Sequence, residues 1–114
     1  MSKLTEVVLS RRKTQEKYFE SYLGWAKIIK KEAERFLGGV RLFIFGSILR
    51  REEVPRDIDI LIISPKLRTA KKKREIKVKI WQKIGIFSPF EIHLVTPQEY
   101  DNWYKNFIKE KVEV

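Results

Sequence analysis

Residues 57–63 read Asp-Ile-Asp-Ile-Leu-Ile-Ile, an aspartate followed by an apolar segment that contains a second aspartate. Pro65 ends the segment, because proline cannot donate a hydrogen bond to a strand ladder. Such a continuous apolar run predicts a strand that is covered on both faces. A carboxylate inside a buried strand is costly unless a cation or several hydrogen-bond donors compensate it. Asp59 is therefore a candidate ligand for a cation.

A second aspartate and a glutamate extend this acidic pattern. Strand alternation places Asp57 on the same face as Asp59, about 7 Å away along the backbone. Residues 90–95 alternate strictly and predict another strand, in which Glu91 points away from its apolar neighbours. If the two strands are adjacent, three carboxylates converge on one face. Their mutual repulsion favours a divalent cation, and oxygen ligands suit Mg²⁺.

Nitrogen and sulfur ligands are scarce in this chain. It contains no cysteine and a single histidine, His93, so a zinc site of the usual kind is excluded. His93 shares the predicted face of Glu91 and could contact substrate. For a lone histidine, however, a structural role is favoured.

The individual residues also have simpler interpretations. Asp57 could cap a turn after Pro55, and Asp59 could form an ion pair with Arg50 or Arg56. A single glutamate on a strand is most often a solvated surface residue. Only the combination of these residues favours a metal site.

The segment before the aspartates supplies groups that suit phosphate. Residues 40–45 form an apolar run that predicts a strand, and Gly46-Ser47 interrupts it. Glycine lets the backbone approach a ligand closely, and the next residues can begin a short helix whose N–H groups suit an anion. Ser47 adds a hydroxyl donor, and Arg50 and Arg51 follow it. Metal-binding acids and phosphate-binding donors are the parts that phosphoryl or nucleotidyl transfer requires.

Three segments resemble the signature of the polymerase-β nucleotidyltransferase superfamily. Residues 45–47 read Phe-Gly-Ser, nine residues follow, and residues 57–59 read Asp-Ile-Asp within an apolar strand. Residues 90–93, Phe-Glu-Ile-His, match the later strand that carries the third acid of the family. The resemblance covers roughly residues 40–96 and is greatest to the minimal nucleotidyltransferases of archaea and bacteria.

The resemblance implies roles for the acidic residues. It implies that Asp57 and Asp59 bind metal and that Glu91 is both a ligand and a candidate general base. It also implies two Mg²⁺ ions and ATP, or another nucleoside triphosphate, as substrate.

The resemblance assigns the phosphate groups to the glycine-serine loop. Gly46 and Ser47 would hold the β and γ phosphates, and Arg50 occupies the position of an arginine found in many members. Those members have a glycine next, where this chain has Arg51. This departure favours the alternative of a non-catalytic protein of the same fold.

The pattern of elements predicts an α/β fold, with a small mixed central sheet flanked by helices. The resemblance implies the nucleotidyltransferase fold, similar to a polymerase-β palm. We expect one domain over residues 1–114, with an N-terminal helix at about 10–37 and a core at about 40–96. A C-terminal helix is expected at about 98–110, and residues 109–114 are expected to fray.

Charge and hydropathy constrain the partners. The 114 residues carry 25 Lys and Arg against 15 Asp and Glu, a formal net charge of +10. This balance favours polyanionic partners such as nucleotides, nucleic acid or an acidic protein. No apolar run approaches the roughly 18 residues that span a bilayer, and no signal peptide is recognised. We expect a cytoplasmic protein.

Three functions are compatible with the motifs, the resemblance and the net charge. The first is Mg²⁺-dependent transfer of a nucleoside monophosphate, AMP from ATP, to a hydroxyl on a protein tyrosine, a small molecule or an RNA end. Small proteins that this chain resembles are often antitoxins paired with an all-helical HEPN-type ribonuclease, to which they add AMP. The second is a non-catalytic antitoxin or other partner-binding protein of the same fold, and the third is a basic nucleic-acid-binding module. A homo-oligomer is compatible with each.

Overall fold

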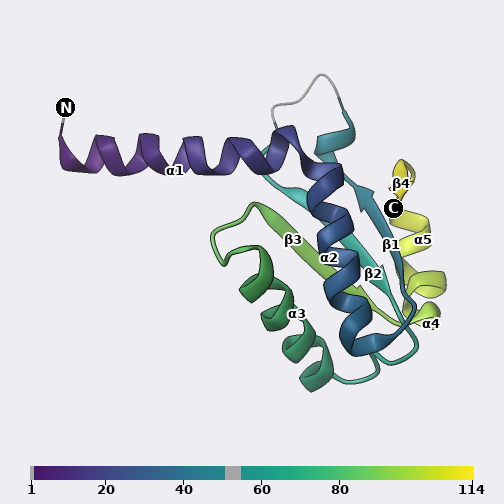
Figure 1. Cartoon of the computed structure of the whole chain (residues 1–114). Helices are drawn as coiled ribbons and strands as arrows, with labels where there is room; N and C mark the ends of the chain where they lie inside the picture. Colours follow the sequence, from purple (N-terminus) through teal and green to yellow (C-terminus); the bar gives the residue numbers. More distant parts are fainter. Residues whose placement is uncertain (1, 51–54) are drawn as a thin grey trace.

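The computed structural model describes residues 2–50 and 55–114. Within these ranges, only the backbone of residues 6–14 is described. Arg51, expected near the phosphate loop, lies outside the described residues. The described part contains a four-stranded sheet with helices on both faces (Figure 1). The strands are β1 (Arg41–Phe45), β2 (Ile58–Ile63), β3 (Phe90–Val95) and β4 (Lys111–Glu113).

The sheet is mixed, and its spatial order is β3-β2-β1-β4. β1 pairs antiparallel with β2 and with β4, whereas β2 pairs parallel with β3. A parallel pair requires a crossover connection, and helix α3 (Ala70–Ile84) provides it. The α/β class with a small mixed sheet, expected from the sequence, is confirmed.

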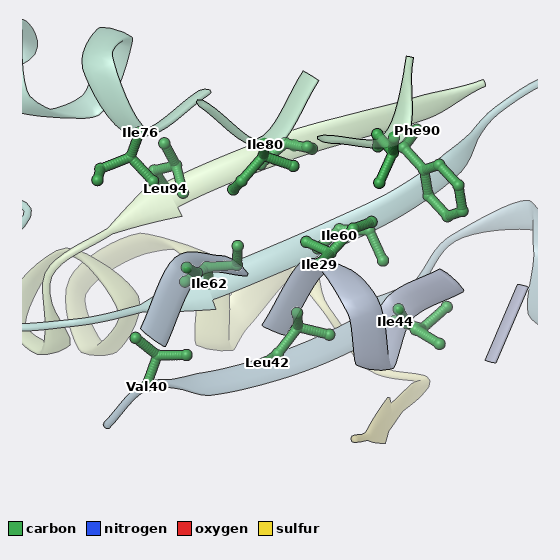
Figure 2. Packing of buried hydrophobic residues seen from close by; sticks show 14 of the residues in the cluster. Ile29, Val40, Leu42, Ile44, Ile60, Ile62, Ile76, Ile80, Phe90 and Leu94 are labelled. Carbon is green, nitrogen blue, oxygen red and sulfur yellow. The ribbon is translucent and has the colours of Figure 1, made fainter. Parts of the chain in front are cut away.

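One face of the sheet packs against helices α2 (Tyr22–Leu37) and α3, which lie side by side (Figure 1). Ile29 of α2 and Ile80 of α3 are fully buried against the strands. Figure 2 shows how their side chains meet those of the strands, which alternate toward this face. The strand residues labelled there are Leu42, Ile44, Ile60, Ile62, Phe90 and Leu94, and Val40 directly precedes β1.

The opposite face is covered by the C-terminal segment, and its core is smaller. This segment consists of α4 (Pro97–Glu99), the π-helical turn η2 (Tyr100–Tyr104) and α5 (Lys105–Phe107). The buried cluster on this face comprises Phe43, Leu61, Ile63, Val95 and Ile108, with Phe45, Tyr100 and Tyr104 packed against it. By strand alternation, Asp59 and Glu91 belong to this face.

The ends of the helices follow local sequence signals. Thr69 caps α3, and its hydroxyl accepts a hydrogen bond from the backbone N–H of Lys72 at 3.1 Å. Gly38 and Gly85 end α2 and α3 with φ of +73° and +107°, a region that glycine adopts without strain. The sequence predicts both ends, because Gly38 follows the apolar periodicity of residues 18–36 and Gly85 follows that of residues 76–84.

The expected N-terminal helix over residues 10–37 is two helices in the structure. α1 (Lys3–Glu20) begins earlier than expected, and the chain turns at Ser21 before α2. Figure 1 shows α1 extending away from the sheet. The apolar periodicity of residues 18–36 predicts that Phe36 lies on the buried face. In the structure Leu37 is buried instead, and Phe36 is 37% exposed.

The C-terminal region differs from the expected helix over residues 98–110. The helical segment ends at Phe107, and the residues expected to fray form β4. The physical reason is the unpaired edge of β1, whose backbone groups require hydrogen-bond partners. The N–H of Val114 donates to the carbonyl of Leu42 at 3.0 Å, which continues this pairing.

None of the helices in residues 2–50 and 55–114 is long and apolar enough to cross a membrane.

Candidate functional site

Two acidic residues face each other across the parallel strands. Asp59 of β2 is in register with Glu91 of β3, and Phe45 of β1 is in register with Asp59 on its other side. The Asp59 side chain is 21% exposed, and that of Glu91 is 58% exposed. Asp59 therefore lies deeper in the site, and Glu91 lies at its rim.

His93 joins these carboxylates. Its Nε2 atom lies 3.6 Å from Oδ1 of Asp59 and 3.7 Å from Oε1 of Glu91. The potential ligand atoms of the three residues lie within 4.8 Å of one another. Nε2 is buried and has no hydrogen-bond partner among the described residues. A cation between the three side chains would satisfy this atom and both carboxylates.

The electrostatics of the cluster also favour a cation. Burial raises the pKa of Asp59 above its ordinary value, and the nearby Glu91 carboxylate raises it further, while His93 opposes the shift. Two carboxylates at this distance repel each other when both are ionised, and a bound divalent cation relieves that repulsion.

Asp57 lies outside this cluster. It is exposed and directly precedes β2, two residues before Asp59. The structure therefore brings together Asp59 and Glu91 of the three acids singled out in the sequence. It adds His93, for which a structural role was favoured. The sequence signal for His93 is its position two residues after Glu91, on the same face of the same strand, which a structural role for a lone histidine outweighed.

Gly46 packs closely against the Asp59 side chain near the start of β2. Its φ of +86° is a conformation that side chains rarely adopt. A Cβ atom at this position would overlap Oδ2 of Asp59 and would lie 3.1 Å from its Cγ. The chain then forms the short 3₁₀ turn η1 (Ser47–Leu49), in which the N–H of Arg50 donates to the carbonyl of Ser47 at 2.9 Å. Gly46 and Asp59 are thus in direct contact, with Ser47 next to them in the chain.

Two cavities adjoin this end of the sheet. The first, of about 200 Å³, is lined by Phe45, Gly46, Arg50, Phe107, Ile108, Lys109 and Glu110. The second, of about 440 Å³, is lined by Phe45, His93, Glu99, Trp103, Tyr104, Phe107 and Ile108. The cavities share Phe45, Phe107 and Ile108, so the cavity at the Gly46 loop and the cavity at the aromatic C-terminal segment are adjacent.

The geometry agrees with comparisons to known proteins. A family model described as a nucleotidyltransferase domain matches residues 26–113. A crystal structure named "putative nucleotidyltransferase" is 28% identical, with a TM-score of 0.65 over 77% of this chain and 95% of that one. A structure with the same designation from Sulfolobus solfataricus is 20% identical, with a TM-score of 0.51 over 91% of this chain and 85% of that one. It supports the fold alone. No curated protein matches the chain.

The fold, the glycine-serine loop and the family match define the class of protein, which is a nucleotidyltransferase. The chain belongs to the nucleotidyltransferase domain family and is a minimal member of it. Such enzymes transfer a nucleoside monophosphate from a nucleoside triphosphate to an acceptor.

Proposed function

We propose that this protein transfers AMP from ATP, in a Mg²⁺-dependent reaction, to a hydroxyl group of an acceptor. The observation that carries the proposal is the cluster of Asp59, Glu91 and His93 directly beside the Gly46 turn. A candidate ion site beside a glycine turn supports binding of a metal-bound triphosphate, because carboxylates suit Mg²⁺ and glycine lets the backbone approach a ligand closely.

The donor set fits a divalent ion. Asp59 and Glu91 would supply carboxylate oxygens, and the unpartnered Nε2 of His93 is an available nitrogen ligand. Asp57 is exposed, so its side chain can change rotamer at little cost and add a further oxygen ligand. When bound, Mg²⁺ would neutralise charge on the phosphates and promote ionisation of the acceptor hydroxyl.

The remaining residues would orient the substrates. We assign the β and γ phosphates to the backbone of Gly46 and the hydroxyl of Ser47, with the Arg50 guanidinium as a nearby cation. Glu91 is the more exposed acid and is suited to accept a proton from the acceptor hydroxyl. The acceptor oxygen would attack the α phosphorus, and the bond to the β phosphate would break to release pyrophosphate.

The acceptor that we favour is a tyrosine hydroxyl of a partner protein, of the helical HEPN type that accompanies the small nucleotidyltransferases this chain resembles. The net charge of +10 supports an acidic or RNA-bound partner. On this proposal the protein acts as the antitoxin of the pair.

The test uses ATP labelled at either the α or the γ phosphate, with Mg²⁺, in the presence and absence of the candidate partner. We expect the α label alone to be transferred to the partner, and Asp59→Asn to abolish the transfer. Transfer of the γ label would identify a kinase instead. If ATP binds but no label is transferred, the non-catalytic function would be supported.

A further inference from the structure

We propose that the aromatic cavity of about 440 Å³ receives the nucleobase of the nucleoside triphosphate, with Trp103 and Phe107 as its stacking surface. This inference rests on the proposed function, because it concerns the same substrate. It assigns a binding role to the C-terminal helical segment, where the helical spacing of the sequence favours a core or partner-interface role for Trp103.

Two large aromatic rings are exposed at the edge of this cavity. Trp103 is 64% exposed and Phe107 is 71% exposed. Their ring centroids are 6.3 Å apart, and the ring planes differ by 15°. Exposed aromatic surface of this extent is unfavourable in water and often marks a binding site. These two nearly parallel rings are exposed, so each can offer an apolar face on which a heterocyclic base can stack.

The aromatic cavity lies next to the candidate metal cluster, because His93 belongs to both. The His93 ring lies 5.4 Å from the Phe45 ring and 6.0 Å from the Tyr104 ring, measured between centroids. Nε2 of the same histidine faces Asp59 and Glu91. His93 therefore connects the two parts of the site. Its ring lies among the aromatic residues of the cavity, and its Nε2 atom belongs to the candidate metal cluster.

The adjoining cavity indicates what else the ligand must contain. It is lined by Gly46, Arg50, Lys109 and Glu110, and it shares Phe45 and Phe107 with the aromatic cavity. Two cationic side chains against one carboxylate, together with the glycine, favour an anion. A molecule with an anionic part beside a flat ring fits both cavities, and a nucleoside triphosphate has this form. The volume of about 440 Å³ is typical of a small-molecule pocket.

The path of the chain explains how the rings reach this position. Thr96 and Glu99 form a reciprocal capping box at the start of the segment, and Lys73 of α3 holds Glu99 at 2.8 Å. The wider π turn of η2 then carries Trp103, before α5 places Phe107 four residues later. π turns within helices are frequent at functional sites.

The experiment compares Mg²⁺–ATP with Mg²⁺–tripolyphosphate, which lacks base and ribose, by calorimetric titration of the full chain. We expect Trp103→Ala and Phe107→Ala each to weaken ATP binding about tenfold, the loss that follows removal of one base-stacking ring. Tripolyphosphate binding should stay within about twofold of the wild type. Trp103→Phe should restore most of the ATP affinity, because it keeps an aromatic face.

Phe36→Ala is the matched control, since Phe36 is an exposed aromatic residue on α2, which covers the other face of the sheet. It should leave both affinities unchanged. The inference is overturned if the variants bind ATP like the wild type, including the case in which only their affinity for the acceptor falls. It is also overturned if ATP and tripolyphosphate binding weaken equally. Failure of the wild type to bind either ligand with Mg²⁺ would instead remove the proposed function.

Discussion

Gly46 lies directly against the carboxylate of Asp59. The contact arises because Phe45, the last residue of β1, is in register with Asp59 on the antiparallel neighbour β2. The chain must therefore turn beside the acid, and it does so with a φ of +86° at Gly46. A Cβ atom there would overlap Oδ2 of Asp59. The loop and the acid are fitted to each other, so a change in one should disturb the other.

Gly46→Ala should destabilise the protein and weaken Mg²⁺–ATP binding together. The positive φ alone costs a residue with a side chain about 1–3 kcal/mol. The overlap with Asp59 adds to this cost and displaces a proposed metal ligand. Urea denaturation and a thermal shift with Mg²⁺–ATP measure the two effects.

Gly24→Ala is the control for that variant. Gly24 lies within α2, and a Cβ atom there would meet nothing within 4 Å. Alanine should raise the free energy of unfolding by about 0.5–1 kcal/mol, because it lowers the entropy lost on helix formation. Equal behaviour of the two variants would show that the fit between Gly46 and Asp59 has no consequence.

Asp59→Asn and Glu91→Gln should separate binding from chemistry. A ligand at about 100 times its Kd raises the free energy of unfolding by roughly 2.7 kcal/mol. We expect Asp59→Asn to lose most of this stabilisation by Mg²⁺–ATP, since Asp59 is the deeper acid. Glu91→Gln should keep a measurable part of it but lose AMP transfer. Full transfer activity in the Glu91 variant would contradict its assignment as the base.

His93→Ala should weaken Ni²⁺ binding more than Mg²⁺ binding. Imidazole nitrogen is a favoured ligand for Ni²⁺, whereas Mg²⁺ prefers oxygen ligands. The His93 Nε2 atom is buried and unpartnered beside both carboxylates, so it is available as a ligand. Titration of each ion into wild type and variant measures the difference. Unchanged affinity for both ions would assign His93 a purely structural role.

Glu99→Gln should reduce the dependence of the free energy of unfolding on pH under acidic conditions. Burial would raise the pKa of Glu99, but hydrogen bonds from Lys73 and Thr96 outweigh it and hold the pKa below the ordinary value of 4.5. Between the lowered pKa of folded Glu99 and the ordinary value of 4.5, this residue binds more protons in the unfolded chain than in the folded one. The free energy of unfolding therefore rises with pH in this range. This contribution is present above about pH 4.5 and is lost as the pH falls through the folded pKa.

The size of this effect should be below about 1 kcal/mol, because the Glu99 side chain is 42% exposed and solvent screens it. Lys73→Gln removes the other partner and should reduce the same pH dependence. Urea denaturation between about pH 3 and 6 provides the test, because this range brackets the ordinary glutamate pKa of 4.5. An unaltered slope in both variants would mean that the α3–α4 ion pair adds nothing to folding.

Lys71→Glu combined with Lys72→Glu should slow association with an acidic or RNA-bound partner and reduce its salt dependence. Both residues lie in the first turn of α3, where Lys71 is exposed. Lys73 is left unchanged because it pairs with Glu99. Mg²⁺–ATP binding should remain intact, as neither residue lines the two cavities beside Gly46. Association rates at several salt concentrations measure the effect.

The sequence by itself determined the elements whose signals are local. The apolar run of β2 and the alternation of β3 predicted both strands with the bounds that the structure has. Gly38 and Gly85 marked the ends of two helices, because a left-handed cap depends on the residue at that position alone. Strand parity also placed Glu91 and His93 on one face.

Only the tertiary structure decided which of these residues meet. Asp59 and Glu91 are neighbours because α3 brings β3 parallel to β2 in a single register, and no residue near either acid encodes that register. His93 enters the cluster, and Asp57 remains outside it, for the same reason. The exposed residues of β4 are too few for alternation to predict a strand. This strand forms because its backbone pairs with the edge of β1. Periodicity is a property of neighbouring residues in the chain, whereas pairing depends on backbone groups that every residue shares.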